Sequence, residues 1–440
     1  MSDETRHRRF GRRARIGAVS AVTAVAAAAG AFGATAASAA PAKPAGGSCA
    51  PSVSSQYFGS TIEPYTGKIT AVYRYTLSNC RGVSAKILTF GGIVQEINVP
   101  GRNGHVTDVT LGFKTLQDYV TYDSPPVTAN GGPYFGESIG RYGNRIAKGT
   151  FTLDQPGVGP VKYTLPINNN GNTLHGGLVG WGNHIWAGQA VHGKGTAGVQ
   201  LTLISPNGDQ GFPATLKAVV TYTLNNANQL AIHYKTTDES KNLNSVINQT
   251  NHSYFNLAGQ ASAAGSAYGQ LVQMNANEYT PTDLTQIPLG YNVPVAGTPF
   301  DFRTPHTIGS RIDDVSAPDN APAAYNQLLL AQGYDHNWVL NKQTAATTGP
   351  DGLNLAAHAW DPASGRELTV WTDQPGVQFY SGNFLTGTLV GITGNTYRQG
   401  AGYTFETQHF PNSPNQPNFP STEIKAGQTI NSTTIFAFSS

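Results

Sequence analysis

The chain has 440 residues, of which only 12% are charged, whereas Gly (51), Pro (27), Tyr (20) and Phe (18) are plentiful. This composition favours many short strands joined by turns and argues against long helices with charged faces. The formal net charge is +2, and much of the positive excess lies in the first fifteen residues. The body of the chain therefore lacks the basic character of proteins that bind nucleic acid or anionic lipid, and we expect a small neutral ligand.

The N-terminus has the pattern of a signal peptide over residues 1–39. An arginine-rich stretch, 1–17, precedes an alanine-rich apolar stretch, 18–34, and the run ASA at 37–39 supplies the small residues of a cleavage site. Alanine interrupted by Gly and Thr partitions poorly into hydrocarbon, so we expect no stable membrane association once this leader is removed. We therefore expect a secreted protein, exported by the general secretory route or, given the arginine pair at 12–13, by the twin-arginine route.

Residues 40–54 follow the predicted leader and begin with a run rich in Ala, Pro and Gly, so we expect a flexible segment there. Cys49 and Cys80 are the only cysteines of the chain. In an oxidising compartment two such thiols more often pair than stay free, and with two cysteines the connectivity is unique. We therefore expect one disulfide.

Short alternating segments bounded by turn residues occur along most of the remaining chain, and each predicts a β-strand. The clearest lie at 71–79, 83–100, 199–205, 216–224, 229–237, 367–373, 376–384 and 433–439. No stretch after the leader predicts a long amphipathic helix and no linker divides the body, so we expect one all-β, antiparallel domain over residues 55–440. The stretches 259–270 and 342–354 are expected to be surface loops.

Three of the predicted strands carry polar side chains on one face, because side chains alternate across a sheet. These faces consist of Asn248, Thr250 and His252; of Gln378 and Tyr380; and of Thr404, Glu406 and Gln408. The polar face of a single strand usually just lies in water. Three such faces, made of amides, hydroxyls, a histidine and a glutamate rather than a mixture of Lys and Glu, indicate a surface that binds hydroxyl groups. A sugar is the natural ligand.

Eight motifs resemble, in the same order, those of the aldose 1-epimerase family, whose members are also called galactose mutarotases. They are YFGESIGRYGNRIAKGTF (134–151), NNNGNTLHGG (168–177), GWGNHIW (180–186), SPNGDQGFPATLKAVVTYTL (205–224), NQTNHSYFNLAG (248–259), GYDHNWVL (333–340), QPGVQFYSGNF (374–384) and ETQHFPNSPNQPNFP (406–420). The resemblance extends over roughly residues 55 to 438. One departure is the strand before Glu406, which has GYTFETQ where the family more often has Cys-Leu before the glutamate.

This resemblance implies a large antiparallel β-sandwich of the galactose mutarotase type, with a sugar bound across its concave sheet, and interconversion of the α and β anomers of an aldose such as glucose or galactose. It also implies that Glu406 is the general base and His252 the general acid. Ring opening requires both roles, since the anomeric hydroxyl loses a proton while the ring oxygen gains one. From the residues alone, a structural His252 and a solvent-exposed Glu406 remain alternatives.

Five further residues are implied as substrate contacts by the same resemblance: Asn144, Arg145, His175, Asp335 and Gln378. In the same motifs, Arg141 and Lys148 are expected to be framework or surface charges. Core packing is expected for the aromatic group of GWGNHIW, with a platform for the sugar as the alternative: Trp181, His184 and Trp186.

The sequence contains no HExxH motif and no paired CxxC, and it has neither a GxGxxG that opens a helix nor a P-loop lysine. We therefore predict no metal and no other cofactor, and the reaction needs none. Two other functions were weighed. A non-catalytic carbohydrate-binding module would be expected to lose Glu406 or His252, and a sugar-phosphate epimerase would need a cluster of Arg or Lys. A small-molecule aldose is the expected partner, and the protein is expected to be a monomer.

Overall fold

The computed structural model describes residues 49–124, 132–262 and 265–440. The predicted signal peptide, 1–39, and residues 40–48 lie outside the described residues. Within the described ranges, strands dominate and only two short α-helices occur, α1 (Leu116–Tyr122) and α2 (Gln327–Ala331). No described helix has the length and hydropathy needed to cross a membrane. The expected all-β fold is confirmed.

Short 3₁₀ turns connect some of the strands. They are η2 (Ala147–Gly149), η3 (Trp181–Asn183), η4 (Asp209–Gly211), η5 (Ile308–Ser310), η6 (Ala345–Thr347), η7 (Pro350–Gly352) and η8 (Ser413–Asn415).

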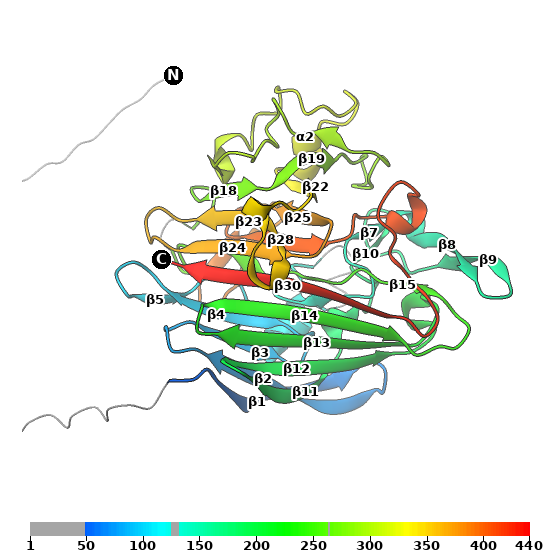
Figure 1. Ribbon diagram of the computed structural model, residues 1–440, viewed down its shortest axis with the longest axis horizontal. Helices are drawn as coiled ribbons and strands as arrows, with labels where there is room; N and C mark the ends of the chain where they lie inside the picture. The colour runs from blue at the N-terminus through cyan, green and yellow to red at the C-terminus, as the bar shows by residue number, and fades with distance from the viewer. Residues whose placement is uncertain (1–48, 125–131, 263–264) are drawn as a thin grey trace, which may run out of the picture. The chain divides into compact units, whose positions relative to one another are not determined.

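A nine-stranded antiparallel sheet forms one layer of the fold (Figure 1). In spatial order its strands are β11 (Ala187–Gly193), β12 (Thr196–Ser205), β13 (Leu216–Asn225), β14 (Gln229–Asp238), β30 (Thr429–Ser439), β24 (Glu367–Thr372), β23 (Asn354–Trp360), β18 (Leu271–Met274) and β21 (His306–Thr307). Along β13 and β14, buried residues alternate with residues that solvent reaches. This is the pattern of a sheet with one face on the core and one face in water.

Two antiparallel sheets form the opposing layer. The five-stranded sheet contains β1 (Ser52–Glu63), β2 (Lys68–Ser78), β3 (Ser84–Leu88), β4 (Val94–Pro100) and β5 (Val106–Asp108) in that order. The six-stranded sheet has the order β17 (Tyr254–Phe255), β28 (Tyr403–Gln408), β25 (Gly376–Tyr380), β22 (Asp335–Leu340), β19 (Ala276–Thr280) and β20 (Val293–Pro294).

One continuous apolar core lies between the two layers. Ile97 of the five-stranded sheet, Phe379 of the six-stranded sheet and Ile232 of the nine-stranded sheet all belong to it. Across the layers, the rings of Phe255 in β17 and Phe436 in β30 have centroids 5.0 Å apart. Packing of two sheets face to face over a shared core makes the fold a β-sandwich, as expected.

Five two-stranded antiparallel ladders complete the strand pairing of the described residues. They are β7 (Arg145–Ile146) with β10 (Thr173–Leu174), β6 (Ser138–Ile139) with β16 (Thr250–Asn251), β8 (Thr150–Gln155) with β9 (Gly159–Thr164), β15 (Ser245–Val246) with β29 (Glu423–Ile424), and β26 (Thr386–Val390) with β27 (Thr396–Arg398).

The stretch 248–259 is not the single regular strand that its sequence predicts. It forms two short strands with different partners, since β16 pairs with β6 whereas β17 pairs with β28. Both faces of this stretch are buried, and the amides of its three asparagines donate to backbone carbonyls. The amide of Asn248 donates to the carbonyl of Gly143 at 3.1 Å, and the amide of Asn251 donates to the carbonyl of Gly136 at 2.9 Å.

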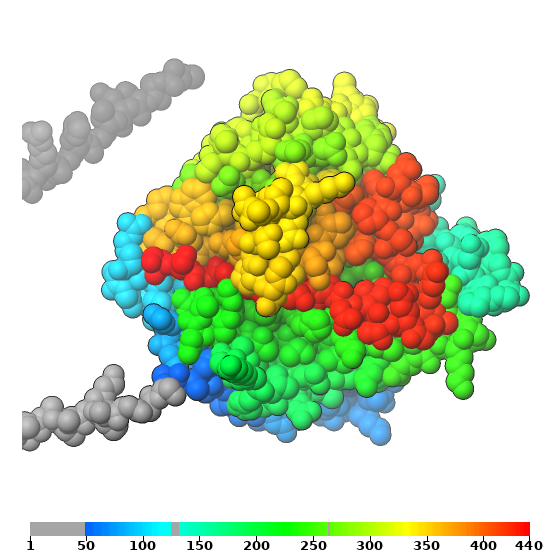
Figure 2. All heavy atoms as spheres, viewed as in Figure 1, coloured from blue at the N-terminus to red at the C-terminus, as the bar shows by residue number. Residues whose placement is uncertain are grey.

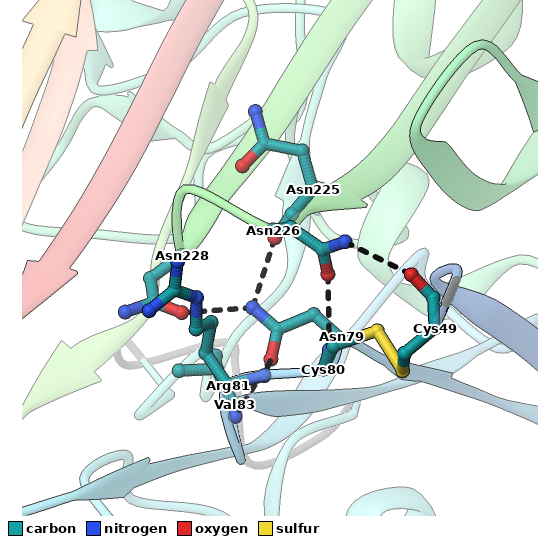
Figure 3. Close-up of a disulfide and its surroundings, with 8 residues drawn as sticks. All are labelled: Cys49, Asn79, Cys80, Arg81, Val83, Asn225, Asn226 and Asn228. Carbon is teal, nitrogen blue, oxygen red and sulfur yellow. Dashed lines mark hydrogen bonds between the residues drawn. A yellow bond between two sulfur atoms is a disulfide. The ribbon is translucent and has the colours of Figure 1, made fainter. Parts of the chain in front are cut away.

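The N-terminal edge of the domain is held by the expected disulfide, Cys49–Cys80 (Figure 3). Next to it, the amide of Asn79 donates at 2.8 Å to the carbonyl of Asn225, and the amide nitrogen of Cys80 donates at 3.0 Å to Asn226, so the turn between β13 and β14 is tied to this edge. β1 begins at Ser52 and pairs there with β2, three residues before the domain boundary expected at residue 55.

The two expected surface loops differ in exposure. The segment 342–354 is mostly exposed and lies on the face seen in Figure 2, where it is yellow. The described part of 259–270 is only partly exposed, and Gln260 and Ala267 within it are buried.

Candidate active site

The polar face of the six-stranded sheet borders a cavity of about 330 Å³. Six of the seven residues predicted for the site line it: Asn144, Arg145, His175, His252, Asp335 and Glu406. They come from five separate stretches of the chain. Asp335 in β22 and Glu406 in β28 belong to one sheet, because both strands pair with β25. The ladder of β7 with β10 brings Arg145 close to His175.

Glu406 faces the cavity because β28 alternates between core and cavity. Its neighbour Phe405 points the other way, into the core, where its ring stacks on Phe379 with centroids 5.4 Å apart. On the cavity side, the hydroxyl of Thr404 donates to Glu406 Oε1 at 3.0 Å. The predicted division of β28 into an apolar and a polar face is therefore present, but the polar face is buried.

His252 and Glu406 form a buried pair, with His252 Nε2 3.4 Å from Glu406 Oε1. Burial lowers the pKa of His252 to about 3. Burial, helped by the charge of Asp335, raises the pKa of Glu406 to about 8. At neutral pH this pair therefore holds one proton, located on Glu406. Within the described part of the chain, His252 Nδ1 and Glu406 Oε2 have no hydrogen-bond partner.

Arg145 and Asp335 lie on either side of Gln286 in a second group of polar contacts. A guanidinium nitrogen of Arg145 donates to Gln286 Oε1, and Gln286 Nε2 donates to Asp335 Oδ2 at 3.2 Å. Arg145 Nε also donates to the side-chain oxygen of Asn169 at 3.1 Å. Burial raises the pKa of Asp335, while the charge of Arg145 opposes the rise. The group thus presents charged and amide groups suited to sugar hydroxyls.

Asn144 and His175 adopt left-handed backbone conformations, with φ of 62° and 48°. Among residues other than glycine, Asn and His are two of the types found most often in this region. The backbone N–H of Asn144 donates to His175 Nδ1 at 3.2 Å, so the neutral ring carries its proton on Nε2. Burial lowers the pKa of His175 well below its usual value, which keeps this ring neutral.

Gln378, predicted as a substrate contact, does not line the cavity. It is buried, and its Nε2 donates to Asp335 Oδ1 at 2.8 Å. The register pairs Gln378 with Glu406 in β28, and its amide reaches Asp335 in β22, so the side chain lies between the two carboxylates. The contact makes Gln378 a positioning residue for Asp335.

The residues expected to be structural also lie outside the cavity. Arg141 is buried and donates to Ser205 and to the carbonyl of Pro213, whereas Lys148 is exposed. Trp181, His184 and Trp186 are buried.

A family model described as aldose 1-epimerase matches residues 73–437 of this chain. The chain therefore belongs to the aldose 1-epimerase family. It is 38% identical over 353 residues to the galactose mutarotase of Sus scrofa, covering 80% of this chain and 90% of that protein. It is 33% identical over 365 residues to the aldose 1-epimerase of Escherichia coli K12, with coverages of 82% and 94%.

Solved structures agree with this membership. The crystal structure of galactose 1-epimerase from Lactobacillus acidophilus superposes with a TM-score of 0.68 at 26% identity, covering 88% of this chain and 98% of that one. As a member of the aldose 1-epimerase family, the protein is an isomerase with the β-sandwich of the galactose mutarotases.

Several cavity residues of this aldose 1-epimerase were not predicted. Tyr134, Tyr254 and Tyr380 bring aromatic rings to the wall, and Gln286 links Arg145 to Asp335. Tyr380 was expected on the polar face of β25 beside Gln378, although not as a substrate contact. Gln286 lies between two short strands in a stretch without periodic pattern, and no feature of the sequence identifies it.

Three side chains of the aldose 1-epimerase site also have the composition of a metal-ligand set. One ligand atom each from His175, His252 and Glu406 lies within 4.8 Å of the other two. His252 and Glu406 thus lie close to His175, one of the predicted substrate contacts.

Proposed function

We propose that the protein interconverts the α and β anomers of free aldoses such as glucose and galactose. The observation that carries the proposal is the His252–Glu406 pair, two buried groups 3.4 Å apart at the wall of a cavity lined by hydroxyl-binding side chains. The names of the relatives, galactose mutarotase and aldose 1-epimerase, support the same reaction.

In the proposed ring opening, Glu406 takes the proton of the anomeric hydroxyl while His252 donates a proton to the ring oxygen. The C1–O5 bond breaks, and C1 becomes the carbonyl carbon of an open-chain aldehyde. Rotation about the C1–C2 bond presents the other face of the carbonyl. Reclosure then reverses both proton transfers, with His252 removing the proton from the O5 hydroxyl and Glu406 returning one to the carbonyl oxygen.

The protonation state of the His252–Glu406 pair is compatible with this cycle. The reacting state has Glu406 ionised and His252 protonated, whereas burial favours two neutral groups. Both states contain one proton, so transfer across the 3.4 Å contact converts one into the other. We infer that sugar hydroxyls, by hydrogen bonding to the unpartnered oxygen of Glu406 and nitrogen of His252, stabilise the charged state.

Two features of the cavity argue against a sugar-phosphate epimerase and against a non-catalytic sugar-binding module. Among the described lining residues, Arg145 is the one cationic side chain, and it stands with the carboxylates of Asp335 and Glu406. A phosphate group would meet one guanidinium there, with the carboxylate of Asp335 beside it, and not the cluster of Arg or Lys that it needs. A non-catalytic sugar-binding module has no need for an acid–base pair with its carboxylate pKa raised toward neutrality.

We also propose that the protein is exported and acts as a monomer. The pattern of residues 1–39 and the Cys49–Cys80 disulfide support export, because disulfides persist in oxidising compartments. Intact-mass measurement of secreted protein tests this, with a mature chain expected to begin near Ala40. Light scattering after size exclusion tests the monomer, and a dimer mass would contradict it.

Polarimetry on freshly dissolved α-D-galactose and α-D-glucose tests the proposed activity, and anomer-resolved proton NMR on a panel of aldoses identifies the preferred sugar. We expect equilibration of the anomers to be accelerated far above the spontaneous rate. A purified, folded protein that leaves the spontaneous rate unchanged for every sugar of the panel would contradict the proposal.

A further inference from the structure

The side chain of Gln286 lies between two charged groups of the cavity wall. Its Oε1 accepts a hydrogen bond from a guanidinium nitrogen of Arg145, and its Nε2 donates to Asp335 Oδ2 at 3.2 Å. Gln286 is buried and lines the cavity. The ion pairs of the described residues do not include one between Arg145 and Asp335. The amide of Gln286 thus separates two opposite charges that attract each other.

The chemistry of the amide suits both neighbours. A guanidinium only donates hydrogen bonds and an ionised carboxylate only accepts them, whereas an amide does both. A carboxylate at position 286 could not donate to Asp335, and an ammonium group could not accept from Arg145. The two contacts together therefore require the amide and not only a side chain of this size.

The backbone fixes the position of this amide. Gln286 has a left-handed conformation with φ of 63°, which is uncommon for residues other than glycine. It belongs to a turn closed by Asp283, whose Oδ1 accepts the backbone N–H groups of Thr285 at 2.7 Å and Ile287 at 3.1 Å. The backbone N–H of Gln286 donates to the carbonyl of Asp283 at 2.9 Å. Such conformations persist only where the surrounding structure holds them, and they cluster at functional sites.

We propose that Gln286 is a positioning residue that keeps Arg145 and Asp335 apart and so leaves both available to the substrate. The inference rests on the proposed function, in which both groups bind hydroxyls of the sugar. Gln286 and Asn169 use two of the five guanidinium N–H groups of Arg145, which leaves three for hydroxyls. Gln286 and Gln378 donate to different oxygens of Asp335, and each oxygen keeps a lone pair. A direct ion pair would instead satisfy the two charged groups with each other.

Gln286→Met removes both hydrogen bonds with a side chain of similar length. Arg145 and Asp335 should then pair directly, and KM for galactose should rise by about tenfold to a hundredfold, the loss expected for a hydrogen bond to a charged group. The kcat should change little, because lost binding that is equal in substrate and transition state raises KM alone. Gln332→Met is the matched control and should leave KM unaltered, since Gln332 is exposed, has a left-handed φ of 54° and lies outside the cavity.

Gln286→Glu separates hydrogen bonding from the filling of space. The substituted side chain has the same size and still accepts from Arg145, but it cannot donate to Asp335 and adds a negative charge beside it. KM should therefore rise in this variant too. A wild-type KM would overturn the proposal, because it would leave Gln286 with a role in packing only.

A double variant tests whether Gln286 acts through the charge of Asp335. Asp335→Asn removes the charge that attracts Arg145, so no ion pair is left for Gln286 to prevent. Gln286→Met should then raise KM by a much smaller factor in the Asp335→Asn protein than in wild type. Equal factors in the two backgrounds would overturn the positioning role.

Ligand-observed proton NMR measures galactose binding without turnover, and thermal unfolding establishes that each variant is folded. The Kd for galactose should follow KM across the variants. If wild type binds galactose without mutarotating any sugar, and Gln286→Met weakens the binding, the proposed function fails while the positioning role stands. If wild type is active and folded Gln286→Met binds galactose as tightly as wild type, the positioning role fails while the proposed function stands.

Discussion

In β13 and β14 of the nine-stranded sheet, buried residues alternate with residues that solvent reaches, whereas every residue of β25 and β28 in the six-stranded sheet is buried. Both sheets present one apolar face to the same core. They differ in what covers the other face. Water covers it in β13 and β14, and the walls of the cavity cover it in β28, where burial shifts the pKa of Glu406. The same local pattern therefore supports solubility in one sheet and chemistry in the other.

The largest expected effect comes from removing the base on the buried polar face. Glu406→Gln keeps the size of the side chain but cannot accept a proton, so kcat should fall by about 10² to 10⁴. Lys235→Gln, on the exposed side of β14, is the matched change in the nine-stranded sheet and should leave kcat unaltered. Polarimetry measures both rates. The double variant with His252→Asn should lose less than the product of the single losses, because the two groups act in one step.

A wild-type rate in Glu406→Gln would contradict the acid–base role and would favour a sugar-binding protein.

The pH dependence should distinguish the buried carboxylate from an exposed one. Because the pKa of Glu406 is raised to about 8 in the free protein, the pair loses its shared proton above that pH, and kcat/KM should fall about tenfold for each further unit. On the acid side, His252 gains a second proton for the pair only below about pH 3, so the rate should be level between these limits. Stopped polarimetry from pH 4 to 10 tests this. A rate that rises from pH 8 to 10 would exclude the shared-proton state.

Truncating a core side chain of the nine-stranded sheet should affect stability but not chemistry. Ile232 in β14 is fully buried, and Ile232→Ala should lower the free energy of unfolding by about 2–5 kcal/mol through lost burial and a cavity. The kcat of the folded protein should not change, because Ile232 lies in the core between the two layers and does not line the cavity. Urea unfolding and polarimetry measure the two quantities. A large loss of kcat in folded protein would show that the two sheets are coupled.

Removing the disulfide should have a similar but smaller effect. The bridge joins residues separated by 31 positions, and Cys49→Ser with Cys80→Ser should lower the free energy of unfolding by about 2–4 kcal/mol by freeing the unfolded chain. The bridge lies at the N-terminal edge beside the β13–β14 turn, so activity should persist (Figure 3). Thermal unfolding compares the variant with wild type. Loss of activity at temperatures where the variant remains folded would contradict this separation.

The smallest expected effect is on KM, and it distinguishes Asp335 from Gln378 in the six-stranded sheet. Asp335→Ala removes a charged hydrogen-bonding group from the cavity, which is worth about 1.5–3 kcal/mol and should appear mainly as a higher KM. Gln378→Ala should raise KM less, because Gln378 acts by holding Asp335. The double variant should bind no worse than Asp335→Ala alone. An additional loss in the double variant would restore Gln378 as a direct substrate contact.

The sequence by itself determined the class of the fold and the chemistry of two strand faces. Alternation is a local property, so the segments 216–224 and 229–237 identify β13 and β14 almost to the residue. The same rule separated Glu406 from Phe405 in β28. The roles of Glu406, His252 and the other predicted site residues came from the family motifs, because alternation assigns a face and not a function.

Tertiary structure alone decided which polar groups reach the cavity and how their pKa values shift. The stretch 248–259 breaks because its two halves pair with different strands, so His252 lines the cavity while Asn248 bonds to backbone. Gln378 lies behind Asp335, and Gln286 joins the site from a loop without pattern. Such placements depend on contacts between residues far apart in the chain. The shared proton of His252 and Glu406 depends on burial, which exists only after the two layers and the cavity walls have assembled.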